Sequence, residues 1–292
     1  MNAMPEILVG HDAEFFVMDM EGAYQIPLCE GTKDEPLPLT HGHWQRDNIM
    51  VELNGIPKAN PLAFMKSAQA LFKEASSLLL QDKMYPTIAP NIMLSNTLLE
   101  RDEVKEIGCM PDIDAWTQKQ NKPHDFRDLG AGRYGAGHLH FSWKDSQEYD
   151  DEYKFAVVRS MDLLLMPALA YAYHLGGTDE RDGSRKRRRF YGAPGSMRLK
   201  DYGLEYRVPD NTWLNLCARN QAKSVFFEPM FRAAKACIAF PQYADMLYKN
   251  NPKIVHEIKR YIMQGNTAEL RRMYEESLLK EIVAIENKIC QT

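Results

Sequence analysis

Three separate segments of the chain each place two polar side chains two residues apart among apolar or aromatic neighbours. The pairs are Asp12 with Glu14, His138 with His140, and Glu205 with Arg207. Alternate residues of a β-strand point to the same face, so each pair should project from one side of its segment. Such groups need partners or water, because burial without partners is costly. Together with Glu52 in the sequence NIMVELN, they predict a sheet with one strongly polar face.

The chemistry of this predicted face is that of a cation site. Carboxylates with one or two imidazoles bind hard divalent ions such as Mg²⁺ or Mn²⁺, and nearby arginines hold the phosphates that such ions bridge. Each pair also has an ordinary explanation of its own. The acids can be charges on the solvent side, the histidines can be structural, and the Glu–Arg pair can be a simple salt bridge. The enzyme hypothesis depends on their convergence.

Alternating apolar residues and turn signals indicate where the strands lie. The expected strands cover residues 6–19, 48–54, 135–143, 195–200 and 203–208. Gly10, near the centre of the first, suits a bend or bulge. Between residues 85 and 128 four prolines interrupt short apolar runs, so we expect loops and at most one strand, near 87–94.

Helical spacing of apolar residues predicts an amphipathic helix up to residue 81, preceded by the cap signal Asn60-Pro61. A long apolar helix is expected over 153–174, and residues 218–290 are expected to be helical in three pieces. Strands that lie early and centrally, with helices between and after them, fit an α+β protein with an antiparallel sheet better than a βαβ series. We expect one domain over 1–292, with 218–292 as a mostly helical C-terminal subdomain.

Composition narrows the class of protein. The 292 residues carry a formal charge of -4, and 45% are apolar and 26% charged, as in ordinary globular proteins. The most apolar stretch, 161–175, contains Asp162 and Pro167 and is shorter than the roughly 20 residues of a membrane span. No signal peptide is visible. We therefore expect a cytoplasmic protein with no membrane partner, and the balance of charges disfavours nucleic acid. Nothing in the sequence indicates the oligomeric state.

The sequence lacks the motifs of two common kinds of site, those built from cysteines and those that bind nucleotides through glycine-rich loops. The five cysteines are widely spaced and form no C-x-x-C pair, which is typical of reduced thiols, so we expect neither a disulfide nor a zinc site. No G-x-G-x-x-G or G-x-x-x-x-G-K-[ST] motif occurs. Rossmann and P-loop nucleotide sites are therefore disfavoured, and any ATP must be held in another way.

A basic run, Arg185 to Arg189, follows the loop-like sequence GGTDERDGS. It can be a solvated loop face or a nucleic-acid patch. It can also be a clamp for phosphate or carboxylate, since Arg187, Arg189 and Tyr191 would share one face if a strand began there.

Three motifs of the chain occur in the same order in a known superfamily. They are GHDAEFFVMD (10–19), GAGHLHFS (135–142) and LEYRVPD (204–210). The first is similar to an early strand with acid-x-Glu-Phe-Phe, the second to a Gly-x-His-x-His-x-Ser strand, and the third to a Glu-x-Arg-hydrophobic-Pro-Asp strand. In these features the chain resembles the glutamine synthetase and glutamate–cysteine ligase superfamily. Its length is most similar to that of the compact carboxylate–amine ligases, or amidoligases, of tailed phages and bacteria.

The resemblance implies a glutamine-synthetase-like curved antiparallel sheet with helices on its outer face, two divalent ions (Mg²⁺ or Mn²⁺) and ATP. It implies an ATP-dependent carboxylate–amine ligase that forms an amide or peptide bond through an acyl phosphate. The implied metal ligands are Asp12, Glu14, Glu52, His138 and Glu205. The nucleotide would lie along His140, Ser142 and Arg198, to which the clamp hypothesis adds Arg187 and Arg189. The implied catalytic groups are Arg198, Arg207 and Glu205.

The chain also departs from the superfamily pattern. Asp12 stands where a Glu is usual, and Glu52 is the one firm acid of the middle strand where glutamine synthetase uses two. No segment for ammonia or glutamate is visible, so we expect other substrates, whether small molecules or peptides. Two alternative functions stay open: a metal-dependent phosphotransferase on the same sheet, and a phage nucleic-acid-binding or virion-associated protein that uses the basic run.

Overall fold

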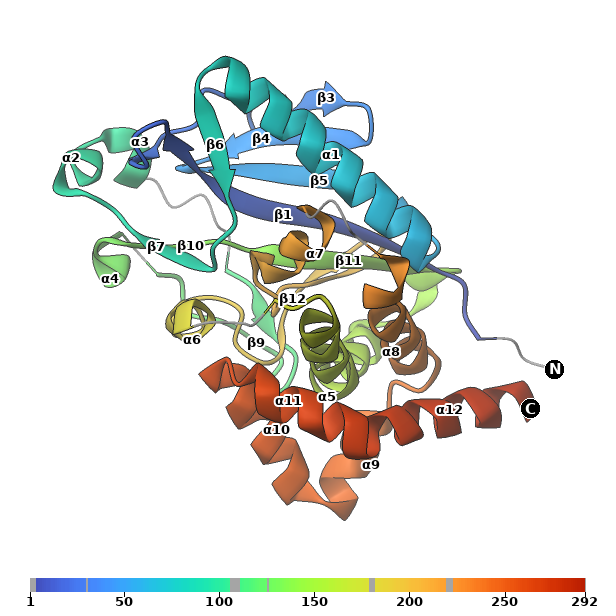
Figure 1. The fold of residues 1–292 in the computed structure, drawn as a ribbon. Helices are drawn as coiled ribbons and strands as arrows, with labels where there is room; N and C mark the ends of the chain where they lie inside the picture. The colour runs from blue at the N-terminus through green and yellow to red at the C-terminus, as the bar shows by residue number, and fades with distance from the viewer. Residues whose placement is uncertain are drawn as a thin grey trace.

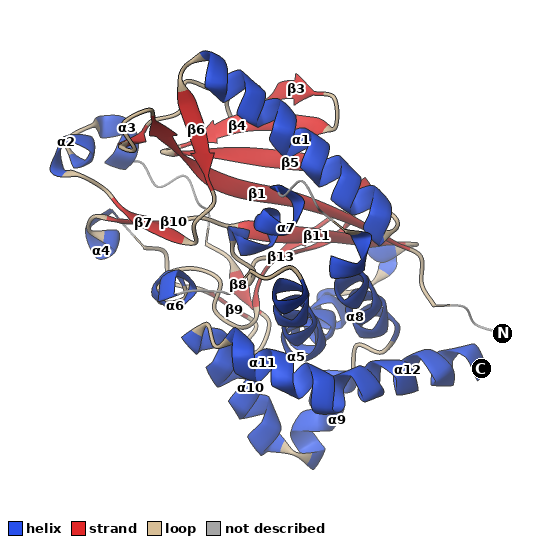
Figure 2. Ribbon diagram, in the orientation of Figure 1, coloured by secondary structure: helices blue, strands red, loops and turns tan. Residues whose placement is uncertain are grey.

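The centre of the fold is one antiparallel sheet (Figures 1 and 2). It is seen in a computed structural model that describes residues 4–29, 31–105, 111–124, 126–178, 182–218 and 223–291. Within these residues eleven strands form the sheet in the order β3-β4-β5-β1-β11-β13-β12-β8-β9, and β2 and β6 also pair with β1. Its strands are β1 (Ile7–Asp19), β2 (Tyr24–Gln25), β3 (Leu37–Leu39), β4 (Gly42–Asp47), β5 (Met50–Lys58), β6 (Met84–Thr87), β8 (Ile113–Asp114), β9 (Lys119–Gln120), β11 (Gly137–Trp143), β12 (Ser196–Lys200) and β13 (Gly203–Tyr206). The predicted α+β class with an antiparallel sheet is confirmed.

The long strand β1 lies between β5 and β11 and sets the register of the site. Its pairing with β5 shifts between Val9 and His11, which is the irregularity predicted around Gly10. Pairs directly across neighbouring strands are Asp12 with His138, Glu14 with Glu52, and His140 with Glu205. Side chains opposite one another on one face lie about 5 Å apart. The register therefore gathers the polar pairs of three distant segments on one face of the sheet.

The opposite face of the sheet is covered by helices. Helix α1 (Pro61–Gln81) begins as predicted, with the Asn60 side chain accepting a hydrogen bond from the Ala63 amide, and its Phe64 packs edge-on against His11 of β1. Helix α5 (Asp151–Leu175) places the buried Asp162 where it accepts a hydrogen bond from the Tyr206 hydroxyl of β13. His11 and Tyr206 alternate with the polar residues of their strands, so the helices leave the polar face uncovered.

Helix α5 is the core helix of the molecule. Within the described residues it is the one helix that is long and apolar enough, by length and composition, to cross a membrane, and 94% of its most apolar window is buried inside the structure. Burial among other helices and the sheet is what a core helix requires.

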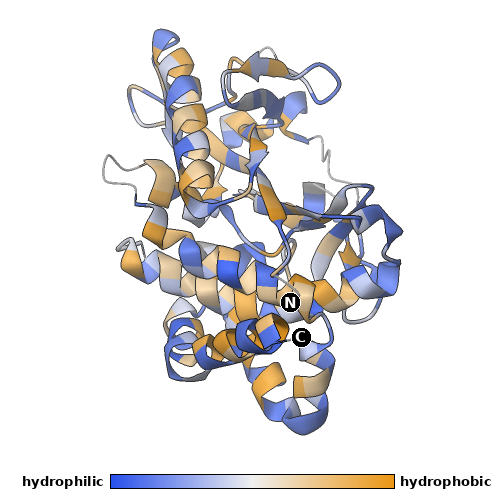
Figure 3. Ribbon diagram, turned by 90° about the vertical axis from the view of Figure 1, so that its right-hand side faces the viewer, coloured by the Kyte–Doolittle hydropathy of each residue, from blue (hydrophilic) through white to orange (hydrophobic). Residues whose placement is uncertain are grey.

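The C-terminal part of the chain is helical, as predicted, but in more pieces. The helices after the sheet are α7 (Leu214–Ala218), α8 (Glu228–Ala239), α9 (Tyr243–Asn250), α10 (Pro252–Gln264), α11 (Thr267–Met273) and α12 (Leu279–Gln291), with 3-10 turns η2 (Asn211–Trp213) and η3 (Ser224–Phe226) and a π-helical turn η4 (Tyr274–Leu278). An additional break occurs at Asn251, which caps α10. These helices carry hydrophobic and hydrophilic residues along their length (Figure 3), and their buried residues join the main core, as Ile258 and Leu270 do.

Two regions differ from the predictions. No strand was predicted between residues 20 and 47, yet this stretch forms β2, β3 and β4. The strand expected to begin at residue 48 starts instead at Met50. The strand expected to carry Arg187, Arg189 and Tyr191 on one face does not form, because helix α6 (Asp182–Arg187) and a turn occupy these positions. Residues 179–181 of the expected loop, and Cys109, lie outside the described residues.

The remaining elements are short and lie mainly where loops were expected. They are β7 (Asn91–Met93), which pairs with β10 (Gly132–Tyr134), and the helical turns α2 (Asn96–Leu99), α3 (Asp102–Lys105), α4 (Phe126–Leu129) and η1 (Ser146–Glu148). The strand expected near 87–94 corresponds to β7.

Candidate active site

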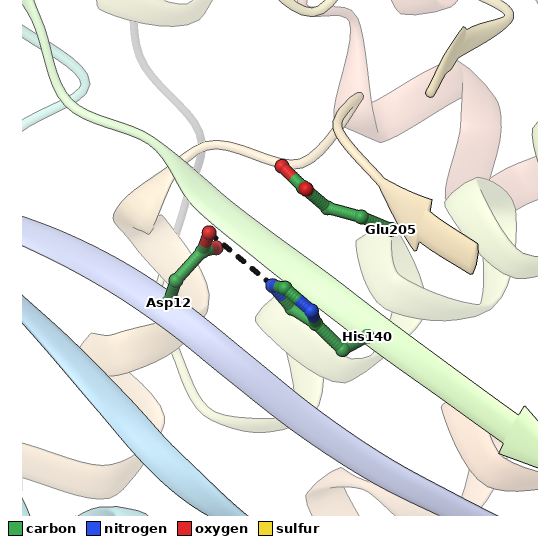
Figure 4. Close-up of side chains that lie close together, drawn as sticks. All are labelled: Asp12, His140 and Glu205. Atoms are coloured by element: carbon green, nitrogen blue, oxygen red, sulfur yellow. Dashed lines mark ion pairs between the residues drawn. The ribbon is translucent and has the colours of Figure 1, made fainter. Parts of the chain in front are cut away.

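Asp12, His140 and Glu205 form a first cluster on the polar face of the sheet (Figure 4). They come from β1, β11 and β13, and each offers a ligand atom within 4.8 Å of the others. The Nε2 atom of His140 lies 3.2 Å from an Asp12 carboxylate oxygen, and its Nδ1 atom hydrogen-bonds the Tyr202 hydroxyl. Two carboxylates and an imidazole thus converge from three strands.

His138 and Arg207 lie directly beside the first cluster. The Nδ1 atom of His138 is 3.1 Å from Asp12 Oδ1 and 3.6 Å from Glu205 Oε1. The Nη1 atom of Arg207 approaches the same imidazole nitrogen at 3.3 Å and also donates to Glu205. The predicted metal ligands Asp12, His138 and Glu205 are therefore brought together, with His140 equally close to Asp12.

Glu14, Asp47 and Glu52 form a second cluster, again with ligand atoms within 4.8 Å of one another. Glu14 accepts a hydrogen bond from the Ala136 amide at 2.7 Å, and Glu52 accepts one from the Gln45 side chain at 3.0 Å. Lys33 lies 2.9 Å from Asp47. Because Asp12 and Glu14 are alternate residues of β1, this one strand contributes a carboxylate to each cluster.

The second cluster is electrostatically unfavourable when all its acids are ionised. Burial, followed by repulsion from Asp47 and Glu52, raises the pKa of Glu14 well above its usual range. Burial and the neighbouring charges of Asp12 and Asp47 raise the pKa of Glu52 to about 8. Glu14 and Glu52 therefore favour their protonated forms, and a divalent ion would remove the repulsion that raises these two pKa values.

The first cluster behaves in the opposite way, because histidines and basic side chains surround its acids. Burial alone would raise the pKa of Asp12, but the neighbouring His138 and His140 hold it well below its usual range. Burial and the Arg207 charge lower the pKa of His138 to about 4. Burial works against protonation of His140 as well, yet the carboxylates of Asp12 and Glu205 raise its pKa. His138 is therefore neutral at physiological pH and can offer a nitrogen lone pair.

Cationic side chains line the β12–β13 side of the first cluster. Lys200 lies 3.0 Å and Arg198 3.7 Å from the carboxylate of the fully buried Glu205. Burial would raise the pKa of Glu205, but His138 and Arg207 keep it lowered. Arg198 and Arg207 were predicted from the motifs. Such a concentration of positive charge suits the phosphate oxygens of a nucleotide.

A cavity of about 620 Å³ opens beside the second cluster. Glu14, Asp47 and His138 line its polar end, and its walls include apolar groups such as Ile49 and Met50. We call it the first cavity.

The basic run is divided between solvent and interior: Arg185, Lys186 and Arg189 are exposed, whereas Arg187 and Arg188 are buried. Arg187 is 1% exposed, lines the first cavity, and donates a hydrogen bond to the Val208 carbonyl. Arg188 is buried as well and donates to the carbonyls of Gly192 and Val208. Arg189 is exposed and lines a neighbouring cavity. Because α6 ends at Arg187 and a turn follows, Arg187 and Arg189 line different cavities. In a strand, both side chains would have pointed to the same face.

Sequence reasoning missed several residues of the site. Asp47 ends β4 and is the third carboxylate of the second cluster. The Asn48 that follows it in the turn to β5 has a positive φ of 59°, which Asn tolerates. Lys200 lies at the end of the strand predicted over 195–200, but nothing in the sequence marked its side chain. Lys33 and Tyr202 lie in segments with no distinctive pattern. Ser142 is half-buried and lies on β11 two residues beyond His140, opposite Leu8 of β1, so it shares the polar face as expected.

The comparison with protein families identifies the type of enzyme. The model of the family described as phage phiEco32-like COOH.NH2 ligase-type 2 matches residues 132–287, more than half of the chain. The chain belongs to this family. The ligase thus has the predicted activity, the ATP-dependent joining of a carboxylate to an amine. The matched range includes β11 and β13, which carry the His138 and Glu205 motifs.

Several solved structures are similar to the ligase, each at low sequence identity. Apo GmaS is 14% identical, with a TM-score of 0.44, over 93% of the ligase and 69% of GmaS. A bifunctional glutathione synthetase from Pasteurella multocida is 13% identical, with a TM-score of 0.41, and the ligase spans 47% of its length. A glutamine synthase homologue is 11% identical, with a TM-score of 0.37, over 92% of the ligase and 67% of that chain. No curated protein sequence matches the ligase.

Proposed function

We propose that the ligase binds two divalent cations, one at each cluster. The first cluster offers two carboxylates and an imidazole, with His138 as a second imidazole, and the second cluster offers three carboxylates. Oxygen donors with imidazole suit Mg²⁺ or Mn²⁺. The observation that carries this proposal is the high pKa of Glu14 and Glu52, since buried acids crowded together are the environment that a cation would neutralise.

The proposed first step activates the acid substrate. A carboxylate oxygen attacks the γ-phosphorus of ATP, so a new P–O bond forms, the bond to the bridging oxygen breaks, and ADP leaves. A carboxylate needs this activation because oxide is a poor leaving group and phosphate a good one. Arg198, Lys200 and Arg207 lie where negative charge would gather on the transferring group. Bound divalent ions would supply further charge neutralisation for the phosphate oxygens.

The proposed second step forms the amide. The amine nitrogen attacks the acyl carbon, the C–O bond to phosphate breaks, and the nitrogen gives its proton to a neighbouring base. With a cation bound, the three carboxylates of the second cluster would keep a net negative charge beside the first cavity, which would attract a protonated amine. This amine would lose one proton to solvent before its attack. We propose that the amine substrate enters through this cavity, while the nucleotide lies along His140, Ser142 and Tyr202.

The phage description of the family also supports a proposal for where the ligase acts. We propose that it works in the cytoplasm of a phage-infected cell, on small-molecule or peptide substrates.

A screen of carboxylate and amine pairs tests the proposal. ADP release should require Mg²⁺ or Mn²⁺ and both substrates, and mass spectrometry should detect an amide. Release of ADP with the acid alone, giving a stable phosphate ester, would indicate a phosphotransferase instead.

The Glu52→Gln variant tests the metal assignment. It removes one ligand charge with little change of volume, so metal-dependent ADP release should fall by roughly 100-fold while the thermal unfolding profile stays cooperative. Glu281→Gln, at an exposed position of α12, serves as the control and should retain full activity. Full activity in Glu52→Gln would contradict the second cation site.

A further inference from the structure

A second cavity of about 680 Å³ adjoins the first and lies next to the basic run. Both cavities are lined by Tyr191 and Arg207. No residue of either acidic cluster lines the second cavity among the described residues. It is therefore a separate compartment that meets the first cavity at these two shared side chains.

The second cavity is strongly cationic. Lys122, Arg188, Arg189 and Arg207 line it, against one carboxylate, that of Asp112. Asp112 already accepts a hydrogen bond from Asn121 at 2.7 Å and lies 3.6 Å from Arg207 Nε. The carboxylate of Asp112 is thus already paired with Asn121 and Arg207.

The positively charged side chains of the second cavity differ in the contacts that they already make within the protein. Arg188 is buried and donates to the Gly192 and Val208 carbonyls, so it adds fixed positive charge to the wall. Lys122 and Arg189 are exposed, and no acidic group of the described residues forms an ion pair with either. These two side chains can receive an anion without breaking an internal contact.

We propose that the second cavity binds a second anionic group of the acid substrate, so that the acid of this ligase is a dianion. This inference rests on the proposed function, in which the amine occupies the first cavity beside Glu14 and Asp47. The acid then reaches Arg207 from the other side, where positive charge attracts it. The reactive carboxylate lies at Arg207, where the two cavities meet, and the remote anion lies against Lys122 and Arg189. The remote group is a carboxylate or a phosphate, both of which accept hydrogen bonds from Lys and Arg.

Equilibrium binding without turnover tests the proposal by isothermal titration calorimetry in the presence of Mg²⁺. The probes are succinate, glutarate and adipate, their monocarboxylate counterparts of equal length, and phosphoglycolate for the phosphate alternative. At least one dianion should bind the wild-type ligase about tenfold more tightly than its monoanionic counterpart. Lys122→Gln and Arg189→Gln should each remove most of that preference, and the more tightly bound series should reveal whether the remote group is a carboxylate or a phosphate.

Two controls separate this proposal from others. Arg185→Gln removes an exposed charge from the same basic run that lines neither cavity, and should leave the preference for dianions unchanged. ADP affinity should also be unchanged in Lys122→Gln and Arg189→Gln. The proposal is overturned if no dianion binds better than its monoanion, or if the two variants weaken ADP in place of the dianion, which would make them nucleotide ligands. Because no turnover is measured, a failure of the proposed amide-forming chemistry would leave these results interpretable.

Discussion

Arg187 can reach the first cavity because position 192 has no side chain. Gly192 has a φ of +68°, and a Cβ atom placed there would lie 2.0 Å from Arg187 Nη1. The left-handed conformation is itself unfavourable for other residues. The glycine therefore allows the turn after α6 and leaves room for the buried guanidinium of Arg187.

Gly192→Ala should lower kcat/KM roughly tenfold or more, because a displacement of about 1 Å at a site can reduce the rate by 10²-fold. Gly130→Ala is a matched control: Gly130 has a φ of +55°, but no atom lies within 4 Å of the position of its Cβ. Both variants should lose stability from the left-handed backbone, measured by thermal unfolding, and Gly192→Ala should lose more because of the clash. Only Gly192→Ala should lose activity. Equal activities in the two variants would show that the position of Arg187 does not matter.

Asp162 makes the stability of the protein depend on pH. Burial raises its pKa from 3.8 to about 7, so the folded protein keeps a proton that the unfolded chain loses near pH 4. The folded state binds more protons between these values, and the free energy of unfolding therefore falls as pH rises from about 4 to 7.

Asp162→Asn should remove this part of the pH dependence, since an amide can still pair with the Trp116 indole and the Tyr206 hydroxyl. Urea unfolding at pH 5 and pH 8 measures the effect. The free energy of unfolding of the variant, minus that of the wild type, should be about 2 kcal/mol larger at pH 8 than at pH 5. If the difference in free energy of unfolding between Asp162→Asn and wild type is the same at both pH values, Asp162 is ionised throughout this range.

At the scale of elements, a buried hydrogen bond at Ser184 helps to hold the short helix α6 in place. The Ser184 hydroxyl donates a hydrogen bond to Asp210, whose other carboxylate oxygen accepts the Thr212 amide at 2.8 Å. This contact ties α6 to the segment that follows β13, and so fixes the helix that supplies Arg187.

Ser184→Ala should reduce kcat/KM several-fold, because α6 and Arg187 lose an anchor worth about 1 kcal/mol. Ser160→Ala is the control. Ser160 is equally buried and donates to the Pro241 carbonyl, away from the site. It should lower the midpoint of thermal unfolding by a comparable amount and leave kcat/KM unchanged. A loss of activity in both variants would indicate general destabilisation.

Elements with a strong repeating pattern could be predicted from the sequence. The alternation in β1, β11 and β13 and the cap at Asn60 are local signals, and they were sufficient to predict Asp12, His138 and Glu205 as neighbours. Asp47 was missed because β4 is short and its partner β3 contains a proline, so the hairpin depends on pairing with β5 rather than on local preference. Helix α6 was missed because its Arg187 is buried by hydrogen bonds to the carbonyls of Arg207 and Val208, which are distant in the sequence, and a basic run gives no sign of such burial.

At the scale of the whole molecule, cation binding and folding should be coupled. The second cluster holds protons at neutral pH when no cation is bound, with the Glu52 pKa at about 8. A cation must displace these protons, so its affinity should rise with pH towards about 8. Any ligand that binds only the folded state raises its stability.

Added Mn²⁺ should therefore raise the midpoint of thermal unfolding more at pH 8 than at pH 6, as measured by differential scanning fluorimetry. The Glu52→Gln variant should show a smaller increase at pH 8. An increase that is independent of pH would contradict binding at the second cluster.

Strand β1 gives a carboxylate to both clusters, and this has a consequence for redesign of the enzyme. Alternate residues of a strand are about 7 Å apart, so backbone geometry limits how far apart the two proposed cations can lie. Exchanging one side chain can alter how tightly an ion is held, but it leaves that spacing almost unchanged. A single-residue insertion between Asp12 and Glu14 would turn one of the two acids to the helix-covered face, and would thereby remove a carboxylate from one ion site while the other site kept its own.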